Sequence, residues 1–208
     1  MISVTDLAFS YSEKVEIKFP DFSLDVGGQM LILGNSGVGK TTLLHLMAGI
    51  LTPARGSVNI QGNKMEAMSA KQRDRFRGNN IGLVFQRSHF VQSLSVKENL
   101  QLVQFLSGNK QSNERINDVL TSLELQDFAG QKTHQLSIGQ QQRLSVAISV
   151  VNQPALILAD EPTSSLDDEN TDRVVSLLKS QSELVGATLM IITHDHRLKS
   201  AFKTQLAL

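Results

Sequence analysis

The sequence contains no cysteine, and this absence excludes disulfide bonds, thiolate metal sites and cysteine nucleophiles together. An excess of charge of one sign is also lacking, because 20 Lys and Arg residues balance 20 Asp and Glu residues. Proteins that bind nucleic acid irrespective of its sequence need surplus basic side chains, which displace counterions from the phosphates. We therefore expect no nucleic-acid partner.

Long hydrophobic runs are missing as well. No apolar run approaches the roughly 18–20 residues that a helix needs to span a bilayer, and Met1–Asp6 lacks the basic start and apolar stretch of a signal peptide. We expect no membrane span, so an action on a membrane would require a partner. Hydrophobic residues still make up 40% of the 208 residues, enough for the core of one large domain or a domain with a small lobe.

Short apolar segments predict the strands. The early segments Val15–Phe19 and Phe22–Val26 alternate in polarity, which is typical of strands with one face in water. Later apolar runs do not alternate, and such runs suit strands of a parallel sheet buried on both faces. These runs are Met30–Leu33, Ile81–Phe85, Ala155–Ala159 and Thr188–Ile192. Periodicity alone does not exclude buried helix, but their shortness favours strand.

Helical patterns lie between these strands. One apolar face is formed by Leu43, Leu44, Met47, Ile50 and Leu51, and a second by Val174, Leu177, Leu178, Leu184 and Val185 before Gly186. The segment from about residue 90 to residue 138 has helical stretches and no convincing buried strand. Alternation of strand and helix predicts an α/β core, with this segment as a mostly helical lobe inserted between two strands.

The segment Gly34–Thr41 matches the pattern G-x-x-x-x-G-K-[ST]. It directly follows one predicted buried strand and precedes a predicted helix, which makes a chance glycine-rich turn a poor explanation. Glycines let backbone N–H groups surround phosphates, and the helix N-terminus adds further donors. Lys40 would reach the β- and γ-phosphates and Thr41 would ligate Mg²⁺. The predicted binding residues are Gly34, Asn35, Ser36, Gly37, Val38, Gly39, Lys40, Thr41 and Thr42.

Two adjacent acids, Asp160 and Glu161, close the apolar run that begins at Ala155, and Pro162 follows them. The carboxyl ends of parallel strands open onto the ligand crevice. Asp160 suits Mg²⁺, held through its water shell. Glu161 points elsewhere and suits the positioning and deprotonation of an attacking water. Alone, such a pair is usually a solvated turn, but the phosphate loop argues against that reading.

The segment Leu136–Arg143 (LSIGQQQR) resembles the Leu-Ser-Gly-Gly-Gln signature of ATP-binding-cassette ATPases. The resemblance implies a P-loop NTPase core with an antiparallel β subdomain (residues 1–85 and 145–208) and an inserted α-helical subdomain (about residues 88–144). It also implies that Ser137, Gly139 and Gln140 contact the nucleotide of an opposite subunit. Two chains would then form a homodimer around two ATP molecules, each with Mg²⁺.

Other positions fit the same resemblance. Gln86 matches the glutamine that contacts Mg²⁺ and water, and His194 the histidine that contacts the γ-phosphate. Asp167, in the segment Ser164–Asp167, matches an aspartate at the dimer interface. Tyr11 resembles the aromatic residue that stacks on adenine, although the nearby Phe9 could also stack.

One departure from the family pattern stands in the signature. Ile138 occupies the place of the first glycine of the pair, and a β-branched side chain does not adopt a positive φ cheaply. Either the backbone is ordinary there, or the site is tuned. The presence of Ser137, Gly139 and Gln140 favours an active site.

Within the family, Arg77–Gln86 and Gln140–Arg143 resemble the bacterial branch that serves lipoprotein release, macrolide export and peptide-antibiotic resistance. This resemblance implies integral membrane permease subunits and a place on the cytoplasmic face of the inner membrane. Export, lipoprotein release or mechanotransmission would be the task. A groove near Gln86 and Ser88–Leu106 would receive the partner's cytoplasmic helix. An ATPase that regulates a cell-wall hydrolase through a membrane partner stays open as the alternative.

Two other classes fit poorly. A guanine reader needs Asn-Lys-x-Asp after a buried strand, whereas Asn63–Glu66 ends in Glu and follows a turn-like stretch. Cassette ATPases of DNA repair or chromosome organisation insert zinc modules or long coiled coils, and this chain has neither the cysteines nor the room.

Overall fold

A computed structural model describes residues 1–12, 15–86, 89–164 and 166–208. One described sheet is antiparallel and contains β1 (Ile2–Ser12), β2 (Val15–Lys18), β3 (Phe22–Leu24), β5 (Arg55–Ile60) and β6 (Asn63–Lys64). The other is parallel, in the order β10 (Thr204–Ala207), β4 (Gln29–Leu33), β9 (Thr188–Thr193), β8 (Leu156–Asp160) and β7 (Ile81–Val84).

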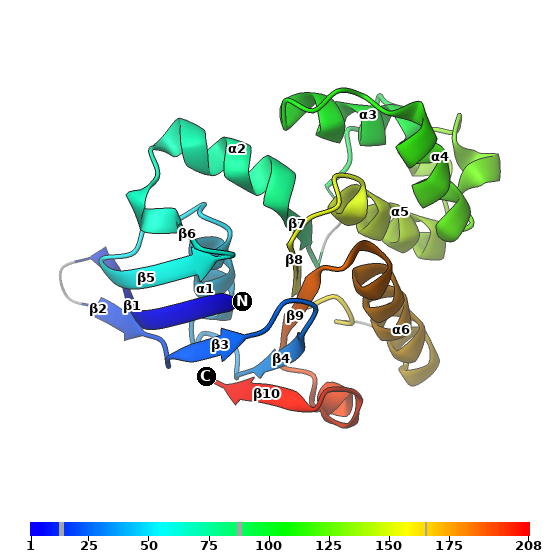
Figure 1. The fold of residues 1–208 in the computed structure, drawn as a ribbon. Coiled ribbons are helices and arrows are strands. Elements are labelled where there is room, and N and C mark those ends of the chain that lie inside the picture. The colour runs from blue at the N-terminus through cyan, green and yellow to red at the C-terminus, as the bar shows by residue number, and fades with distance from the viewer. Residues whose placement is uncertain (13–14, 87–88, 165) are drawn as a thin grey trace.

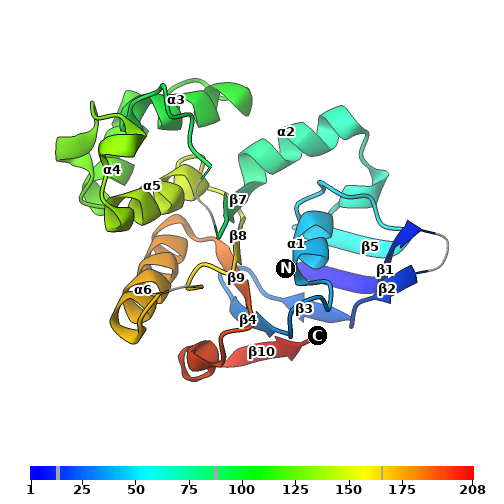
Figure 2. The same ribbon diagram turned by 180° about the vertical axis from the view of Figure 1, so that it is seen from behind.

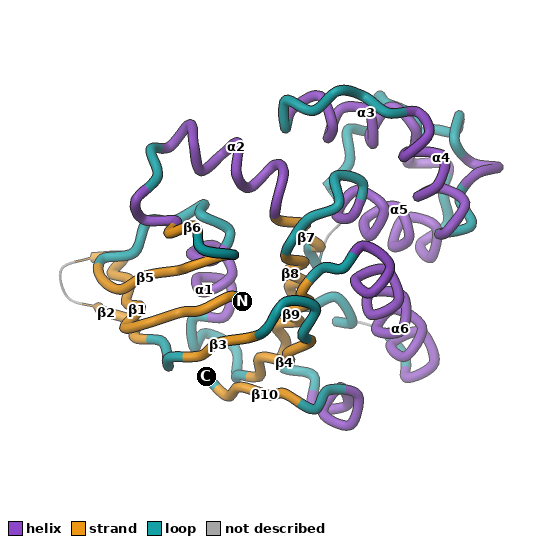
Figure 3. Tube along the Cα trace, viewed as in Figure 1, coloured by secondary structure: helices purple, strands orange, loops and turns teal. Residues whose placement is uncertain are grey.

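The helices are α1 (Lys40–Met47), α2 (Ala70–Asn80), α3 (Val96–Leu106), α4 (Asn113–Ser122), α5 (Ile138–Val150) and α6 (Asp168–Val185). Short 3₁₀ turns occupy Met65–Ala67, Gln126–Phe128, Thr133–Gln135 and His196–Ala201. Figures 1 and 2 show the antiparallel strands with α1 on one side of the parallel strands, and the α3–α4 pair on the other. Figure 3 shows that the strands from β7 to β10 alternate with helical segments along the chain.

The parallel sheet is buried on both faces. In β9, Leu189 and Ile191 belong to the core shared with α3 to α6, whereas Met190 and Ile192 belong to the core shared with α1 and the antiparallel sheet. Successive side chains of a strand point to opposite faces of the sheet, and here they are apolar at every position from Leu189 to Ile192, so both faces are buried. The predicted α/β fold with buried parallel strands is confirmed, although β7 ends at Val84, before Phe85.

Three apolar residues were wrongly placed on buried helical faces. Ile50 and Leu51 lie beyond the C-terminal end of α1, because the chain turns at Gly49 with φ +65°. Leu184 lies on α6, but its side chain is 64% exposed. The α6 face that packs on the core is made by Val174, Val175 and Leu178.

The predicted helical lobe contains α3, α4 and the first part of α5. Helix α5 runs without interruption through residues 144 and 145, where the lobe was expected to end. The separation into a core and an inserted lobe therefore stays a prediction. Ser88, the expected start of the docking segment, lies outside the described residues.

Candidate functional site

The loop between β4 and α1 is shaped by its glycines. Gly37 and Gly39 have φ values of +85° and +103°, a region that residues with a side chain rarely adopt. A Cβ atom on Gly34 would lie 2.7 Å from Val38 Cγ2, so this position is also too close for a larger residue. Gly39 is the N-cap residue of α1 and supplies no side-chain cap. The first N–H groups of α1 are therefore left without a side-chain acceptor from the cap residue, as an anion site requires.

Lys40, the first residue of α1, is nearly buried and folds back over this loop. Its Nζ donates hydrogen bonds to the carbonyl oxygens of Gly34 (2.8 Å) and Asn35 (3.0 Å). The same Nζ lies 3.4 Å from Glu161 Oε1. The ammonium group is thus held between the phosphate loop and the acid at the end of β8.

Thr41 and Asp160 meet where α1 faces the end of β8. Thr41 Oγ1 donates to Asp160 Oδ2 at 3.2 Å. Burial, together with the charge of Glu161, raises the pKa of Asp160 against the hydrogen bond from Thr41, which lowers it. The other oxygen, Oδ1, is buried and has no hydrogen-bond partner among the described residues.

These donors fit Mg²⁺. The ion takes hard oxygen ligands, usually one or two carboxylates with hydroxyl, phosphate and water oxygens, and not an all-protein cage. Asp160 and Thr41 supply a carboxylate and a hydroxyl, and the unpaired Oδ1 leaves acceptor capacity. The described part of the chain contains no group of three or more His, Cys, Asp or Glu side chains suited to a metal.

Glu161 is held in an unusual conformation. Its φ is +49°, which costs free energy for a residue with a side chain and is found most often at functional sites. Oε2 accepts from Thr193 Oγ1 (2.7 Å) and from the His194 N–H (3.3 Å), and Oε1 lies 2.9 Å from His194 Nδ1. Burial acts to raise the pKa of Glu161, but the hydrogen bonds from His194 and Thr193 outweigh it and leave the pKa lowered. A carboxylate kept ionised in this way can accept a proton from water.

Thr193 was not predicted from the sequence. Its side chain is fully buried and connects Glu161 with Asp195. Its hydroxyl donates to Glu161 and accepts from the Asp195 N–H at 3.0 Å. The available signal was a hydroxyl residue at the end of an apolar strand, next to His194. A buried hydroxyl needs a partner, and the carboxyl ends of neighbouring parallel strands are where one is found.

A hollow of about 800 Å³ lies in front of these groups. It brings together most of the residues predicted to bind the nucleotide or act on it: Tyr11, Asn35, Ser36, Gly37, Gly39, Lys40, Thr41, Thr42, Gln86, Glu161 and His194. Ile17 and His196 also line it and were not predicted. Tyr11 is exposed at its rim, where its hydroxyl is 2.8 Å from Thr42 Oγ1 and its ring meets the Phe9 ring edge to face.

A family model described as ABC transporter matches residues 17–164. The chain belongs to the ABC transporter family.

Relatives and solved structures agree with this assignment. The chain is 36% identical over 200 residues to the lipoprotein-releasing system ATP-binding protein LolD of Bacteroides thetaiotaomicron, covering 95% of this chain and 92% of that protein. It is 35% identical to LolD of Bacteroides fragilis, with 95% and 93% covered. The ATP-binding cassette MJ0796, solved as a dimer in a post-hydrolysis state bound to ADP and Pi, superimposes with a TM-score of 0.85 at 30% identity over 100% of this chain and 94% of that one. CbiO1 of Clostridium perfringens, part of the transporter complex cbiONQ, gives 0.81 at 29% identity, with 93% and 78% covered.

As a member of the ABC transporter family, the chain is an ATP-binding ATPase subunit of a transporter-type complex and resembles LolD. Within the described residues, no helix is both long and apolar enough to cross a membrane.

The signature residues of this ABC-family chain lie outside the hollow that contains the phosphate loop. Ser137 caps α5: its Oγ accepts from the Gln140 N–H (3.3 Å), and Gln140 Oε1 accepts from the Ser137 N–H (2.8 Å). Ile138 lies in the first turn of α5 without a positive φ, and its side chain is 76% exposed. The backbone at the departure from the family pattern is therefore ordinary helix. A Cβ atom on Gly139 would meet nothing within 4 Å.

Asp167 is likewise outside the hollow and caps α6, where its carboxylate accepts from the N–H of Asn170 at 2.8 Å. Ser165, part of the predicted interface segment, lies outside the described residues.

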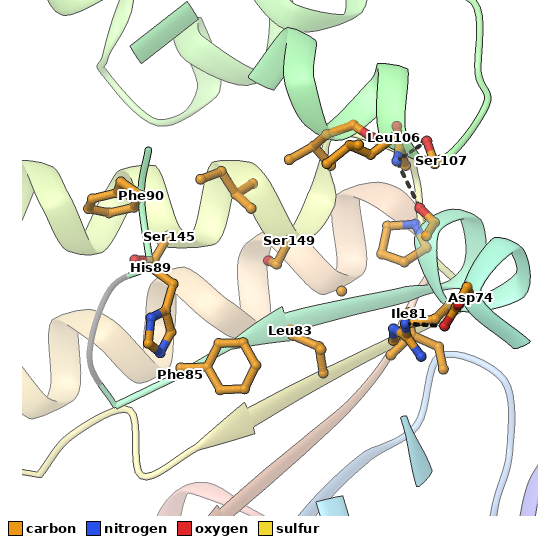
Figure 4. Close-up of a pocket in the computed structure, with 17 residues that line it drawn as sticks. Asp74, Ile81, Leu83, Phe85, His89, Phe90, Leu106, Ser107, Ser145 and Ser149 are labelled. Atoms are coloured by element: carbon orange, nitrogen blue, oxygen red, sulfur yellow. Dashed lines mark hydrogen bonds and ion pairs between the residues drawn. The ribbon is translucent and has the colours of Figure 1, made fainter. Parts of the chain in front are cut away.

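A second hollow, of about 420 Å³, lies between β7, α2, α3 and α5. Figure 4 shows Phe85, His89 and Phe90 along one end and Leu106 near the other. The rings of Phe85 and His89 meet edge to face, 5.3 Å apart. Arg77 and Asp74, paired at 2.6 Å, supply charge at its margin. Phe85 lines this hollow, whereas Gln86, beside which the groove was expected, lines the nucleotide hollow.

Proposed function

We propose that two copies of this chain close head to tail around two ATP molecules, each with Mg²⁺, and that hydrolysis drives an inner-membrane partner. The observation that carries the proposal is the Glu161 carboxylate, held by His194 and Thr193 beside the lysine of the phosphate loop. The strained backbone fits a functional position, and the lowered pKa keeps this carboxylate ionised, so that it can accept a hydrogen bond from the attacking water.

Each group has a role that its position allows. The loop N–H groups and Lys40 bind the phosphates, and Glu161 orients the attacking water and takes its proton. His194 holds Glu161 and reaches the γ-phosphate, and Gln86 lines the same hollow near the water and the metal. Tyr11, at the rim, stacks on adenine. Asp160 and Thr41 would hold Mg²⁺, which when bound neutralises phosphate charge.

Ser137, Gly139 and Gln140 serve the nucleotide of the second copy in this proposal. They lie at the N-terminus of α5, where Ser137 is the cap residue, and none of them lines the hollow of their own chain. Asp167 caps α6 outside the hollow as well, and we assign it to the interface between the copies. The dimeric state of MJ0796 supports the pairing of two copies.

For the partner, we propose an integral membrane permease that inserts a cytoplasmic helix into the hollow between α2 and α3. Its lining is largely apolar, and Phe105 and Leu106 are exposed beside it on α3. Docking there would hold the chain at the cytoplasmic face of the inner membrane. The likeness to LolD favours lipoprotein release as the task.

The test is light scattering after size exclusion on Glu161→Gln, with and without Mg²⁺ and ATP. We expect a monomer that becomes a dimer only with ATP, because this variant should bind ATP without completing its hydrolysis. Glu169→Gln, which removes an exposed acid of α6, serves as the control and should hydrolyse ATP like the wild type. Normal turnover in Glu161→Gln would contradict the role of this acid.

A further inference from the structure

Arg197 carries an unusually large set of bonds for a half-exposed residue. Its Nε donates to Asp195 Oδ1 at 2.9 Å and its Nη2 to Asp195 Oδ2 at 2.7 Å, a two-pronged contact. Its Nη1 donates to Asp168 Oδ1 at 2.5 Å. Both Nη atoms also donate to the Leu166 carbonyl oxygen, at 3.4 and 3.3 Å. Planar guanidinium groups are suited to such forked contacts, which fix geometry as well as charge.

These contacts join two segments that both begin at the site. One starts at Glu161 and runs through Thr163 to Leu166 and Asp168. The other starts at His194 and runs to Arg197. At the starts of the two segments, the side chains of Glu161 and His194 are hydrogen-bonded to each other. Further along, Arg197 of one segment donates to the Leu166 carbonyl oxygen of the other. The result is a closed ring of covalent and hydrogen bonds.

A second connection crosses the middle of this ring. Thr163, fully buried, donates its Oγ1 to Asp195 Oδ2 at 3.2 Å. The backbone N–H of Asp195 in turn donates to Thr193 Oγ1, which donates to Glu161. The Arg197 hydrogen bonds lower the pKa of Asp195 and keep this carboxylate ionised as the common acceptor. A path of hydrogen bonds, continued through the covalent bonds of Asp195, therefore leads from the guanidinium to the carboxylate of Glu161.

We propose that Arg197 is a positioning residue for ATP hydrolysis, which holds the Glu161 and His194 segments together and so fixes the Glu161 carboxylate. The strained φ of Glu161 needs such support, because this conformation persists only where the surroundings enforce it. Arg197 does not line the nucleotide hollow, so its effect falls on the chemical step and not on ATP binding. This inference rests on the proposed function, in which Glu161 orients the attacking water.

Arg197→Met tests it, because the change removes the guanidinium and keeps an unbranched side chain. We expect kcat to fall by about tenfold or more, since a small misplacement of a reacting group has effects of this size. KM and the dissociation constant for ATP should stay within about twofold. The matched control is Arg173→Met, which removes a single exposed arginine–carboxylate pair (Arg173 with Glu169, 2.5 Å) from α6 and should leave kcat unchanged.

Two further variants separate positioning from a merely structural role. Arg197→Lys keeps the charge but loses the fork, so it should recover only part of kcat. Asp195→Asn acts on the same path of bonds. The double variant with Arg197→Met should therefore lose less kcat than the product of the two single losses. Melting temperatures of all variants identify any that fail to fold.

The outcomes are distinct. If Arg197→Met matches Arg173→Met in kcat, or loses kcat, ATP affinity and melting temperature together, the positioning role is overturned while the proposed function stands. If Glu161→Gln, measured in the same series, hydrolyses ATP as fast as the wild type, the proposed function itself fails.

Discussion

The glycine-containing segments at the N-termini of α1 and α5 are both predicted to bind nucleotide, yet the two N-termini are capped differently. At α1 the N-cap residue is Gly39, with no side-chain cap, and the N-terminus faces a hollow of about 800 Å³. At α5 the N-cap is Ser137, which with Gln140 forms a complete capping box. The first helix end is therefore ready for an anion, and at the second the Gln140 N–H is already bonded to the side chain of Ser137.

This difference bears on how the two ends could share a nucleotide. Binding phosphate at α1 breaks no side-chain cap. At α5, an incoming phosphate must compete with the hydrogen bond from the Gln140 N–H to Ser137 Oγ. An ATP molecule should therefore be held mainly by α1 of one chain, with α5 of a second copy adding less.

The largest expected effect comes from Lys40→Ala, which removes the cation at the α1 end. Its Nζ contacts the loop carbonyls and Glu161, so the change also deprives Glu161 of a neighbouring positive charge. Hydrogen bonds to charged groups contribute about 1.5–3 kcal/mol each, and we expect ATP affinity to fall by about a hundredfold. Equilibrium binding of a fluorescent ATP analogue measures this, and unchanged affinity would show that α1 is not the principal phosphate site.

A matched pair of glycine substitutions separates the backbones of the two ends. Gly39→Ala places a side chain at φ +103°, with its Cβ 3.1 Å from Ile17 and 3.3 Å from Phe19. We expect a loss of about 1–3 kcal/mol in unfolding free energy. Gly139→Ala adds a methyl group in open space on ordinary helix, so we expect a gain of about 0.5–1 kcal/mol. Urea denaturation compares the two, and equal effects would contradict the difference between these backbones.

The sequence predicted the fold class and named candidate residues for the site, but it did not predict several contacts between loops. Candidate residues on the phosphate loop, at the end of β8 and directly after β9 could be predicted, because a buried apolar strand followed by a polar residue marks the open edge of a parallel sheet. The roles of Thr193 and Arg197 depend on which loops the fold places together. No pattern along the chain encodes the approach of Arg197 to Leu166.

Missed elements have physical reasons too. Strand β1 loses its alternation where a bulge at Asp6, with φ +46°, makes both Leu7 and Ala8 buried. Helix α2 buries none of its residues, so it has no apolar stripe that a periodicity argument could detect. The capping box of Ser69 and Gln72 is its one signal in the sequence. At Ile138 the sequence left two readings open, an ordinary backbone or a tuned site, and the helical backbone of α5 agrees with the first.

Ser137→Ala tests the cap at α5. The lost hydrogen bond should lower the unfolding free energy by about 1 kcal/mol, and ATP affinity of the single chain should not change because Ser137 is outside its hollow. Introduced together with Glu161→Gln, the change should weaken ATP-driven dimerisation by about tenfold or more. Analytical ultracentrifugation with ATP measures the dimer, and a dimer of unaltered strength would remove Ser137 from the second nucleotide site.

Ile138→Ala should give the smallest effect. The side chain projects from the first turn of α5 and is mostly exposed, so its removal should change unfolding free energy by only a few tenths of a kcal/mol. If α5 faces a second copy, burial of this side chain contributes up to about 1.5 kcal/mol to the dimer, and ATP-driven dimerisation in the Glu161→Gln background should weaken by about tenfold at most. The control is Leu184→Ala, which truncates an exposed apolar residue on a different helix, α6, and should leave the dimer unchanged. A tighter dimer after Ile138→Ala would mean that this side chain crowds the contact instead of adding to it.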